Sequence, residues 1–451
     1  MTKKLFGTDG IRGGANVYPM TAETALKIGA AAALFVKEKG FDSIVLGKDT
    51  RMSGDMLDAA LSAGITGRGV NVLQAGVIPT PGIAFHASSI DHAGAGMVIS
   101  ASHNPYQDNG IKIFKGDGSK LLDSEEDVIE KKVFTINEEN LPRETGRVAP
   151  LSQALDLYAD FLKTTYTPPK DSKTFKIVVD CSNGAAFKVA PKVFFSPYFD
   201  PLFMGNTPDG KNINLNCGSE HTEKLSENVV AGRADLGLAF DGDADRLIAV
   251  DETGKRITGD TILAVCAKHA RDSGRLEPNR IVATVMSNIG FLKAVETLGI
   301  ECFITDVGDR NVLRKMAQTQ AVMGGEDSGH MIFSRYHTTG DGMLTALQLI
   351  SVMAETGQKL SELAGIMKIY PQVLMNVAVN SSKPDFMAIP PIADAIKYVR
   401  EQLDSSGRVL VRYSGTQPLL RVMVEGPDEE DTQKYCRFIC EKIRQSALKD
   451  G

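Results

Sequence analysis

The sequence lacks the features that mark membrane-spanning, secreted or disulfide-rich proteins. No apolar run approaches roughly 18 residues, the length of a membrane span. Lys3 and Lys4 lead through Leu5-Phe6-Gly7 straight into polar turn residues, not into a signal peptide. No C-x-x-C pair occurs among the six cysteines, which are Cys181, Cys217, Cys266, Cys302, Cys436 and Cys440. We therefore expect a cytoplasmic protein with buried free thiols and no disulfide framework.

The chain also lacks a basic surplus and a nucleotide-binding fingerprint. Its formal net charge is -6, which argues against nucleic acid or a membrane surface as a partner, although clustered cations could still bind a small anionic substrate. The N-terminal segment Phe6–Gly13 (FGTDGIRG) is glycine-rich but does not have the G-x-G-x-x-G spacing. A phosphate donor, if one is used, is therefore not expected to be ATP.

The length of 451 residues predicts about three or four domains. An apolar strand, a polar turn and a helix recur at residues 43–65, at residues 176–184 with the helix that follows them, and at residues 281–298, a weak repeat that predicts three related α/β layers. Polar stretches suggest boundaries that give domains of residues 1–150, 151–253, 254–369 and 370–451. The last has an α+β pattern that closes with an amphipathic helix over Thr432–Leu448, with Cys436, Ile439 and Ile443 on one face.

The first candidate site lies in the segment Val98–Phe114 (VISASHNPYQDNGIKIF). Ser102 follows a short strand and precedes His103, and we expect its hydroxyl to be exposed at the strand exit. A turn at Asp108-Asn109-Gly110 leads into a second strand that carries Lys112. The segment thus presents a hydroxyl and an amine on one loop, although most Ser-His pairs on protein surfaces are inert turn residues.

A second candidate is the acidic run Asp241-Gly242-Asp243-Ala244-Asp245-Arg246, which follows an apolar strand. Three carboxylates in a turn of small residues can converge on a hard divalent cation, with Arg246 neutralising charge and meeting phosphate. An EF-hand is excluded because Arg246 stands where that loop needs glycine and a strand precedes the run. The run predicts a Mg²⁺ site; a solvated acidic turn is the alternative.

Two further loops carry polar residues between glycines or serines. In Gly324–His330 (GGEDSGH), Glu326 and Ser328 suit paired sugar hydroxyls and His330 could move a proton near neutral pH, although a lone histidine is more often structural. In Arg412–Pro418 (RYSGTQP), hydroxyls, backbone N–H groups and arginine resemble a phosphate nest without the Walker lysine. An ordinary Ser-Gly turn is the alternative there.

In this order, the blocks resemble the α-D-phosphohexomutase superfamily of phosphoglucomutases and phosphomannomutases over essentially the whole chain. The segments FGTDGIRG, DNGIKIF, YHTTGDG and LLRVMVEG are similar in particular to its bacterial phosphoglucosamine mutase branch. The resemblance implies an isomerase that interconverts glucosamine 6-phosphate and glucosamine 1-phosphate through a phosphoserine enzyme and a sugar 1,6-bisphosphate. That reaction supplies a precursor of UDP-N-acetylglucosamine and of the cell wall.

The same resemblance implies an α/β fold of four domains around a central cleft: three related α/β sandwich domains and a smaller C-terminal α+β domain. It implies that Ser102 carries a phosphoryl group and shares a Mg²⁺ ion with Asp241, Asp243 and Asp245. The remaining implied roles are phosphoryl transfer at Arg12, His103, Lys112, Arg246 and His330, sugar recognition at Glu326 and Ser328, and binding of the non-reacting phosphate at Arg412, Ser414, Gly415, Thr416 and Arg421. Lys112 and His330 both stay open as the acid/base, and a homodimer is implied only by the similarity.

Three places depart from the family pattern. Ala244 replaces a usual glycine and leaves the three carboxylates in place. Asp327 stands where the branch usually has Gln, and Tyr413 and Gln417 stand where Pro and Glu are usual. Because these changes could alter the sugar preference, a phosphoglucomutase or phosphomannomutase is the first alternative. A non-catalytic phosphosugar-binding protein is the second, and the retained Ser102 and aspartates argue against it.

Overall fold

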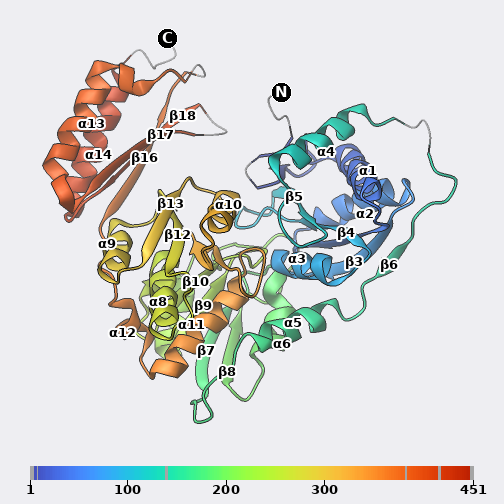
Figure 1. The fold of residues 1–451 in the computed structure, drawn as a ribbon, viewed down its shortest axis with the longest axis horizontal. Helices are drawn as coiled ribbons and strands as arrows, with labels where there is room; N and C mark the ends of the chain where they lie inside the picture. The colour runs from blue at the N-terminus through green and yellow to red at the C-terminus, as the bar shows by residue number, and fades with distance from the viewer. Residues whose placement is uncertain (1–4, 8, 138–140, 381–382, 415–417, 447–451) are drawn as a thin grey trace. The chain divides into compact units, whose positions relative to one another are not determined.

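A computed structural model describes residues 5–7, 9–137, 141–380, 383–414 and 418–446 (Figure 1). The chain divides into two compact units. The first unit contains Met1–Met286 and Ile300–Ile366, and the second contains Ser287–Gly299 and Met367–Gly451. Within the described residues, no helix has the length and apolar character needed to cross a membrane. The six cysteines are free as predicted, and only Cys302 is not fully buried.

The first unit contains three mixed β-sheets. The first sheet has the order β1-β5-β4-β2-β3-β6, with strands β1 Ile11–Gly14, β2 Ser43–Lys48, β3 Asn71–Val77, β4 Ala93–Ile99, β5 Asp108–Lys115 and β6 Val148–Pro150. The second has the order β11-β10-β9-β7-β8, with strands β7 Phe175–Asp180, β8 Phe199–Met204, β9 Leu236–Phe240, β10 Leu247–Asp251 and β11 Arg256–Ile257. The third has the order β13-β12-β14-β15, with strands β12 Arg280–Thr284, β13 Glu301–Thr305, β14 Met323–Gly325 and β15 Met331–Phe333.

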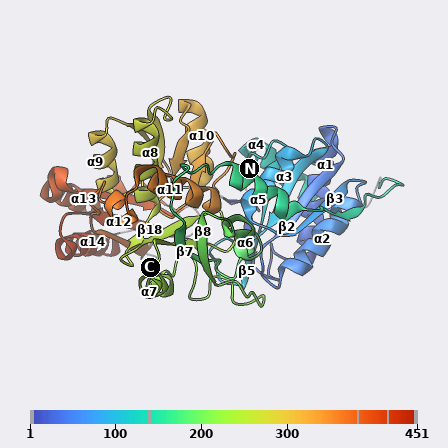
Figure 2. The same ribbon diagram turned by 90° about the horizontal axis from the view of Figure 1, so that it is seen from below.

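One strand pattern occurs in all three sheets. Strands β2, β7 and β12 each pair in parallel with two neighbours, and the later of those neighbours pairs antiparallel with a fourth strand. Figure 2 shows β7 beside β8, as their parallel register requires. The repeat predicted from the sequence is therefore confirmed as a shared topology.

The helices of the first unit pack on these sheets. They are α1 Ala22–Glu38, α2 Gly54–Thr66, α3 Thr80–Ser89, α4 Asp123–Thr135, α5 Ala154–Thr164, η1 Ala185–Phe187, α6 Val189–Phe194, α7 Glu223–Gly232, α8 Gly259–Asp272, α10 Asp309–Thr319, α11 Gly342–Thr356 and α12 Leu360–Ala364. Side-chain caps fix several starts: Asp341 accepts the backbone N–H groups of Met343 and Leu344 at α11, and Thr21 accepts that of Thr24 at α1.

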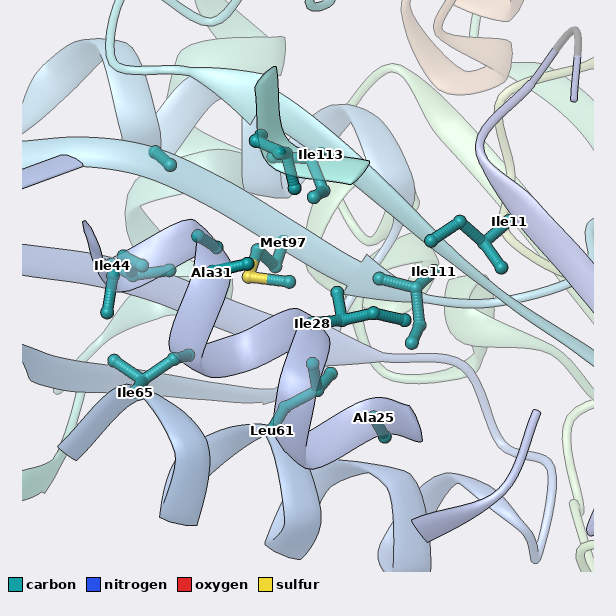
Figure 3. Close-up of a cluster of buried hydrophobic side chains, with 14 of the residues drawn as sticks. Ile11, Ala25, Ile28, Ala31, Ile44, Leu61, Ile65, Met97, Ile111 and Ile113 are labelled. Atoms are coloured by element: carbon teal, nitrogen blue, oxygen red, sulfur yellow. The ribbon is translucent and has the colours of Figure 1, made fainter. Parts of the chain in front are cut away.

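The core of the first repeat shows how apolar periodicity becomes packing. Figure 3 shows Ile28 and Ala31 of α1 close to Leu61 and Ile65 of α2 and to the sheet residue Met97. The two helices approach closely because a Cβ atom on Gly29 would collide with the carbonyl oxygen of Leu61. Burial of this face anchors the sheet whose strand ends carry Ser102.

The second unit is a smaller α+β part. It joins residues 287–299, which we assigned from the sequence to the domain of residues 254–369, to residues 367–451. Its elements are α9 Ile289–Thr297, β16 Gln372–Ala378, η2 Phe386–Ala388, α13 Pro390–Leu403, η3 Asp404–Ser406, β17 Arg408–Tyr413, β18 Leu419–Glu425 and α14 Glu429–Arg444. The sheet is antiparallel with the order β16-β18-β17. Helix α14 begins at Glu429, earlier than the predicted Thr432, because Asp428 accepts the Asp431 N–H, and its face of Cys436, Ile439 and Ile443 is buried.

The topology brings three polar loops to corresponding positions. We call them the third-strand loops: residues 100–107 between β4 and β5, residues 241–246 between β9 and β10, and residues 326–330 between β14 and β15. Each joins the third strand of its repeat to the antiparallel fourth strand. Because the three repeats share this connection, residues far apart in the chain can meet at one place.

Candidate active site

Ser102 lies in the third-strand loop of the first repeat with a φ of 54°, in the left-handed region that serine rarely adopts. Its carbonyl oxygen accepts hydrogen bonds from Arg51 Nη2 and Asn214 Nδ2, both at 2.9 Å, and these bonds hold the backbone in that conformation. The side chain is buried, so the expectation of an exposed hydroxyl was wrong. A Cβ on Gly242 would lie 2.5 Å from the Ser102 carbonyl oxygen, which shows how closely the second repeat covers this loop.

The Ser102 hydroxyl donates to Asp241 Oδ2 at 2.6 Å, and His103 Nδ1 lies 3.2 Å from the same Oγ. The pKa of His103 is lowered to about 4, chiefly by burial and then by the charge of Arg246. His103 is therefore neutral near pH 7. The arrangement directs the hydroxyl at a carboxylate cluster and places a neutral imidazole beside it.

Arg51 holds the loop of Ser102 through hydrogen bonds to its backbone, a role that we did not predict from the sequence. Its guanidinium is fully buried, pairs with Asp49 Oδ2 at 2.8 Å, and donates to the carbonyl oxygens of Ser102, Asn104, Pro105 and Asp108. An Asp-x-Arg pattern directly after a buried strand is the one sequence signal that could have indicated it. Because Arg51 satisfies four carbonyl oxygens of one loop, it fixes the shape of that loop.

Asp241, Asp243 and Asp245 converge as predicted. Their candidate ligand atoms all lie within 4.8 Å of one another, and all three side chains are buried. Burial and the charges of Asp245 and Asp243 raise the pKa of Asp241 well above its usual range. Oδ1 of Asp243 and Oδ1 of Asp245 have no hydrogen-bond partner among the described residues. Crowded, buried carboxylate oxygens without donors fit a hard divalent cation.

Lys112 contacts the cluster from strand β5. Its Nζ lies 2.9 Å from Asp243 Oδ2, 3.2 Å from Asp245 Oδ2 and 3.1 Å from Asp9 Oδ2. Burial alone would lower the pKa of Lys112, but these carboxylates outweigh it and hold the pKa well above its usual range. Lys112 is therefore a fixed cation in this structure. Arg12 Nη2, on β1, lies 2.5 Å from the same Asp9 Oδ2.

His330 and Arg246 come together where two third-strand loops meet. The backbones of these two residues form a β-bridge, and Leu247 N donates to Gly329 O at 3.0 Å. His330 Nδ1 lies 3.6 Å from Asp245 Oδ2, and its Nε2 is buried without a hydrogen-bond partner among the described residues. Burial opposes protonation, but Asp245 outweighs it and raises the pKa of His330. Arg246 Nε lies 3.9 Å from Asp245 Oδ1.

The predicted sugar loop is part of the same assembly. Glu326 Oε1 accepts the Gly308 N–H at 2.9 Å, and Ser328 Oγ is buried without a hydrogen-bond partner in the described part of the chain. Asp327 turns toward the start of α8 instead, where its Oδ1 accepts the Asp260 N–H at 3.4 Å. Asp327, which departs from the family pattern, therefore contacts helix α8, whereas the Ser328 hydroxyl has no hydrogen-bond partner in the described part of the chain.

The predicted phosphate loop lies in the second unit. Arg412 on β17 is directly opposite Arg421 on β18 in the antiparallel register. Ser414 is buried, and its carbonyl oxygen accepts a hydrogen bond from Lys383 Nζ at 2.6 Å, a nearby cation that we did not predict. Tyr413 donates its hydroxyl to the Pro384 carbonyl oxygen at 2.5 Å. Gly415, Thr416 and Gln417 lie outside the described residues.

Comparisons with known protein families match nearly the whole chain. Four phosphoglucomutase/phosphomannomutase models match it in succession: α/β/α domain I over residues 3–140, domain II over 156–254, domain III over 258–370 and the C-terminal domain over 374–442. These matches and the sheets support a four-domain α/β architecture. The exact boundaries predicted from the sequence stay a prediction.

Curated relatives cover the chain from end to end. A phosphoglucosamine mutase of Desulforapulum autotrophicum is 59% identical over 461 residues, covering 99% of this chain and all of the relative. One of Syntrophus aciditrophicus is 51% identical over 446 residues, covering 98% and 99% of the two chains.

Solved structures share the fold at lower identity. A phosphoglucomutase/phosphomannomutase family protein of Burkholderia thailandensis has a TM-score of 0.81 at 23% identity, with 98% of each chain covered. The Aspergillus fumigatus N-acetylphosphoglucosamine mutase, solved in complex with GlcNAc-6P and magnesium, has a TM-score of 0.69 at 17% identity, with 98% of this chain and 96% of that chain covered.

Proposed function

This chain belongs to the phosphoglucomutase/phosphomannomutase family, and from that premise we propose that it interconverts glucosamine 6-phosphate and glucosamine 1-phosphate. The observation that carries the proposal is the Ser102 hydroxyl, held 2.6 Å from Asp241 Oδ2 in a buried cluster of three carboxylates. Curated relatives at 59% and 51% identity are named phosphoglucosamine mutases, which supports the choice of sugar. The product would serve the synthesis of UDP-N-acetylglucosamine.

In the proposed reaction, Ser102 carries a phosphoryl group. The bond between Ser102 Oγ and phosphorus breaks as a sugar hydroxyl oxygen bonds to the same phosphorus, and a base takes the proton of that hydroxyl. The resulting sugar 1,6-bisphosphate turns over and returns its other phosphoryl group to Ser102. Such transfers depend mainly on alignment and on neutralisation of charge. Lys112, Arg12 and Arg246 would supply positive charge for that purpose, since Lys112 contacts Asp243 and Asp245, Arg246 lies beside Asp245, and Arg12 shares Asp9 with Lys112.

The carboxylate cluster suits Mg²⁺, with Asp241, Asp243, Asp245 and Ser102 as the residues that would hold it. When bound there, Mg²⁺ would supply positive charge against the oxygens of the transferring phosphoryl group. The fit rests on the buried oxygens of Asp243 and Asp245 that lack hydrogen-bond donors among the described residues. Without a bound cation, three ionised carboxylates would lie close together, and the raised pKa of Asp241 reflects that repulsion together with burial.

We assign the moving proton to His330 and a fixed charge to Lys112. Three carboxylates hold the Lys112 ammonium in its protonated form, so it is poorly suited to accept a proton. The Nε2 atom of His330 makes no hydrogen bond among the described residues, and Asp309 Oδ2 lies 3.7 Å from it, so Nε2 has the capacity to exchange a proton with a sugar hydroxyl. His103, which is neutral, would instead contact the phosphoryl group on Ser102.

The rest of the substrate would be held by two other loops. Glu326 and Ser328 would bind sugar hydroxyls, since Ser328 Oγ has no hydrogen-bond partner in the described part of the chain. The adjacent cations Arg412 and Arg421, with Ser414, Gly415 and Thr416, would bind the non-reacting phosphate.

We further expect the protein to act in the cytoplasm and, by similarity alone, as a homodimer, which light scattering would test.

A coupled assay tests the proposed function. Purified protein receives glucosamine 6-phosphate, Mg²⁺ and a trace of glucosamine 1,6-bisphosphate, and glucosamine 1-phosphate is measured. We expect turnover that exceeds the rates with glucose and mannose phosphates, and a mass increase of about 80 Da at Ser102. Faster turnover of glucose or mannose phosphate would favour the first alternative. No turnover of any hexose phosphate would contradict the proposal and favour a binding protein.

A further inference from the structure

Three buried or half-buried charged residues lie beside the proposed machinery without a role in it. They are Asp9, Lys120 and Asp309. Lys120 Nζ lies 2.5 Å from Asp9 Oδ1 and also contacts Asp309 Oδ2. The Lys120 and Asp309 side chains are each only 8% exposed. Burial alone would lower the pKa of Lys120, but Asp309 and Asp9 outweigh it and raise the pKa, so the ammonium stays charged.

These residues complete a closed circuit of alternating charge. Asp9 Oδ2 lies 3.1 Å from Lys112 Nζ, whose other partners include Asp245. Asp245 Oδ2 lies 3.6 Å from His330 Nδ1, and His330 Nε2 lies 3.7 Å from Asp309 Oδ2. Lys120 joins Asp309 back to Asp9. The circuit therefore passes through all three repeats and contains both Lys112 and His330.

The circuit gives Lys112 and His330 one further charged neighbour each. Asp9 is a third carboxylate on Lys112, besides Asp243 and Asp245, and Asp309, at the start of α10, lies 3.7 Å from the second ring nitrogen of His330. Gly340 restricts the imidazole further, because a Cβ at that position would overlap the ring of His330. Lys120 is the cation that Asp9 and Asp309 share; without it, Asp9 keeps Lys112 and Arg12, and Asp309 keeps only the more distant His330 among the members of the circuit.

We propose that Lys120 and Asp309 are positioning residues for phosphoryl transfer, acting through Lys112 and His330. This inference rests on the proposed function, because positions matter only if Ser102 exchanges a phosphoryl group. Lys120 ties the first repeat to the third at the site, so it sets the distance between the fixed cation and the proton-carrying ring. Displacement of a reacting group by about 1 Å can cost on the order of 100-fold in rate.

The test separates positioning from simple tethering of the repeats. Lys120→Met keeps the length of the side chain and removes its charge. We expect kcat with glucosamine 6-phosphate to fall by about 10- to 100-fold with KM within about threefold of wild type. Lys120→Arg should recover most of the lost kcat, because it restores a cation between the same carboxylates.

Arg310→Met is the matched control. Arg310 also joins the third repeat to the first, because its guanidinium pairs with Asp123 and Glu126 on α4 and with no member of the circuit. Its backbone N–H donates to Asp309 Oδ1 at 2.7 Å, and Arg310→Met keeps that bond. We expect Arg310→Met to lower the melting temperature while kcat stays within about threefold of wild type. An equal loss of kcat in Arg310→Met and Lys120→Met would overturn positioning and leave only tethering.

A double variant guards against loss of folding. Lys120→Met removes the cation that Asp9 and Asp309 share, whereas Lys120→Met with Asp309→Asn also removes one of the two negative charges and should melt higher than Lys120→Met alone. Its kcat should stay as low as that of the worse single variant, because both changes break the same contact. Recovery of kcat together with the melting temperature would contradict the inference. A wild-type enzyme without mutase activity would instead contradict the proposed function.

Discussion

Ser102 and Ser182 occupy nearly the same local structure and differ in what their hydroxyls touch. Both follow the end of a strand, both are buried, and their φ angles are 54° and 53°. Ser182 donates its hydroxyl to the carbonyl oxygen of its neighbour Cys181 at 2.7 Å, a contact that local geometry alone provides. Ser102 donates to Asp241, 139 positions away in the sequence. Strained backbone and burial therefore do not distinguish the two serines; the distant partner does.

The carboxylates near the two serines repeat this difference. Asp180, in the loop of Ser182, accepts the N–H groups of Ser182 at 2.9 Å and of Gly218 at 2.7 Å, one on each oxygen. Asp243 and Asp245, across from Ser102, each keep one buried oxygen without a hydrogen-bond partner among the described residues. Buried polar atoms are normally satisfied, so two unsatisfied carboxylate oxygens in one acidic loop fit a site that receives a cation.

The sharpest way to break this comparison is to remove each hydroxyl. Ser102→Ala should lower mutase turnover by on the order of 10³-fold or more, because it removes the atom that carries the phosphoryl group. Ser182→Ala should keep kcat within about threefold of wild type. The coupled assay measures both, and circular dichroism checks that both variants fold. Similar losses of turnover in the two variants would mean that the contact between Ser102 and Asp241 does not distinguish a catalytic serine from a structural one.

The carboxylates allow a second contrast, on metal binding. Asp243→Asn keeps the shape of the side chain and removes its charge, so it should lower kcat by about 100-fold and reduce the rise in melting temperature on adding Mg²⁺. Asp180→Asn should keep that Mg²⁺-dependent rise, since both Asp180 oxygens already face backbone donors. Differential scanning fluorimetry with EDTA and then with Mg²⁺ gives both values. An undiminished rise in Asp243→Asn would place the cation elsewhere.

For stability, we expect the larger effect at Asp180 and the smaller effect at Asp243. Asp180→Ala leaves two buried N–H groups without an acceptor and should reduce the free energy of unfolding by about 2–4 kcal/mol. Urea titration measures this loss, and turnover per folded molecule should change much less than in Asp243→Asn. If Asp180→Ala were as stable as wild type, the loop of Ser182 would not be the structural counterpart that we describe.

The smallest expected effect concerns pH and two histidines outside both sets of loops. Burial lowers the pKa of His86 and of His337, which lie 2.8 Å and 2.9 Å from the carbonyl oxygens of Ala154 and Pro81. Below about pH 6.5 the unfolded chain binds protons that the native state does not. The free energy of unfolding should therefore decrease as the pH is lowered, by at most about 1.4 kcal/mol per pH unit for each histidine. His337→Gln should flatten this slope in urea titrations between pH 5 and pH 7, and an unchanged slope would exclude His337 as a source.

Much of the fold was predictable from the sequence because it depends on local periodicity. Apolar runs followed by polar turns indicated the three repeats, and the sheets around β2, β7 and β12 share one topology. The sequence also indicated the convergence of Asp241, Asp243 and Asp245, since alternate positions in one short turn must lie close together.

Contacts between distant segments were not predictable in the same way. The exposed hydroxyl expected at Ser102 proved buried, because Gly242 of another repeat covers the loop. Arg51 looked like an ordinary turn residue, and Lys120 and Asp309 belonged to no motif that we singled out. Each has a partner in a segment at least 51 positions away, which for Arg51 adds to the local pair with Asp49. No local pattern encodes such distances.

The sequence by itself therefore determined which residue types stand at the strand ends and in what order. It specified a hydroxyl, three carboxylates, an imidazole and several cations in loops that follow buried strands. Only the tertiary structure decided which of these side chains lack local partners and face one another. The physical reason is that hydrogen bonds within a turn depend on neighbours in the chain, whereas the path from Asp9 through Lys120 and Asp309 to His330 exists only when the first and third repeats are packed together.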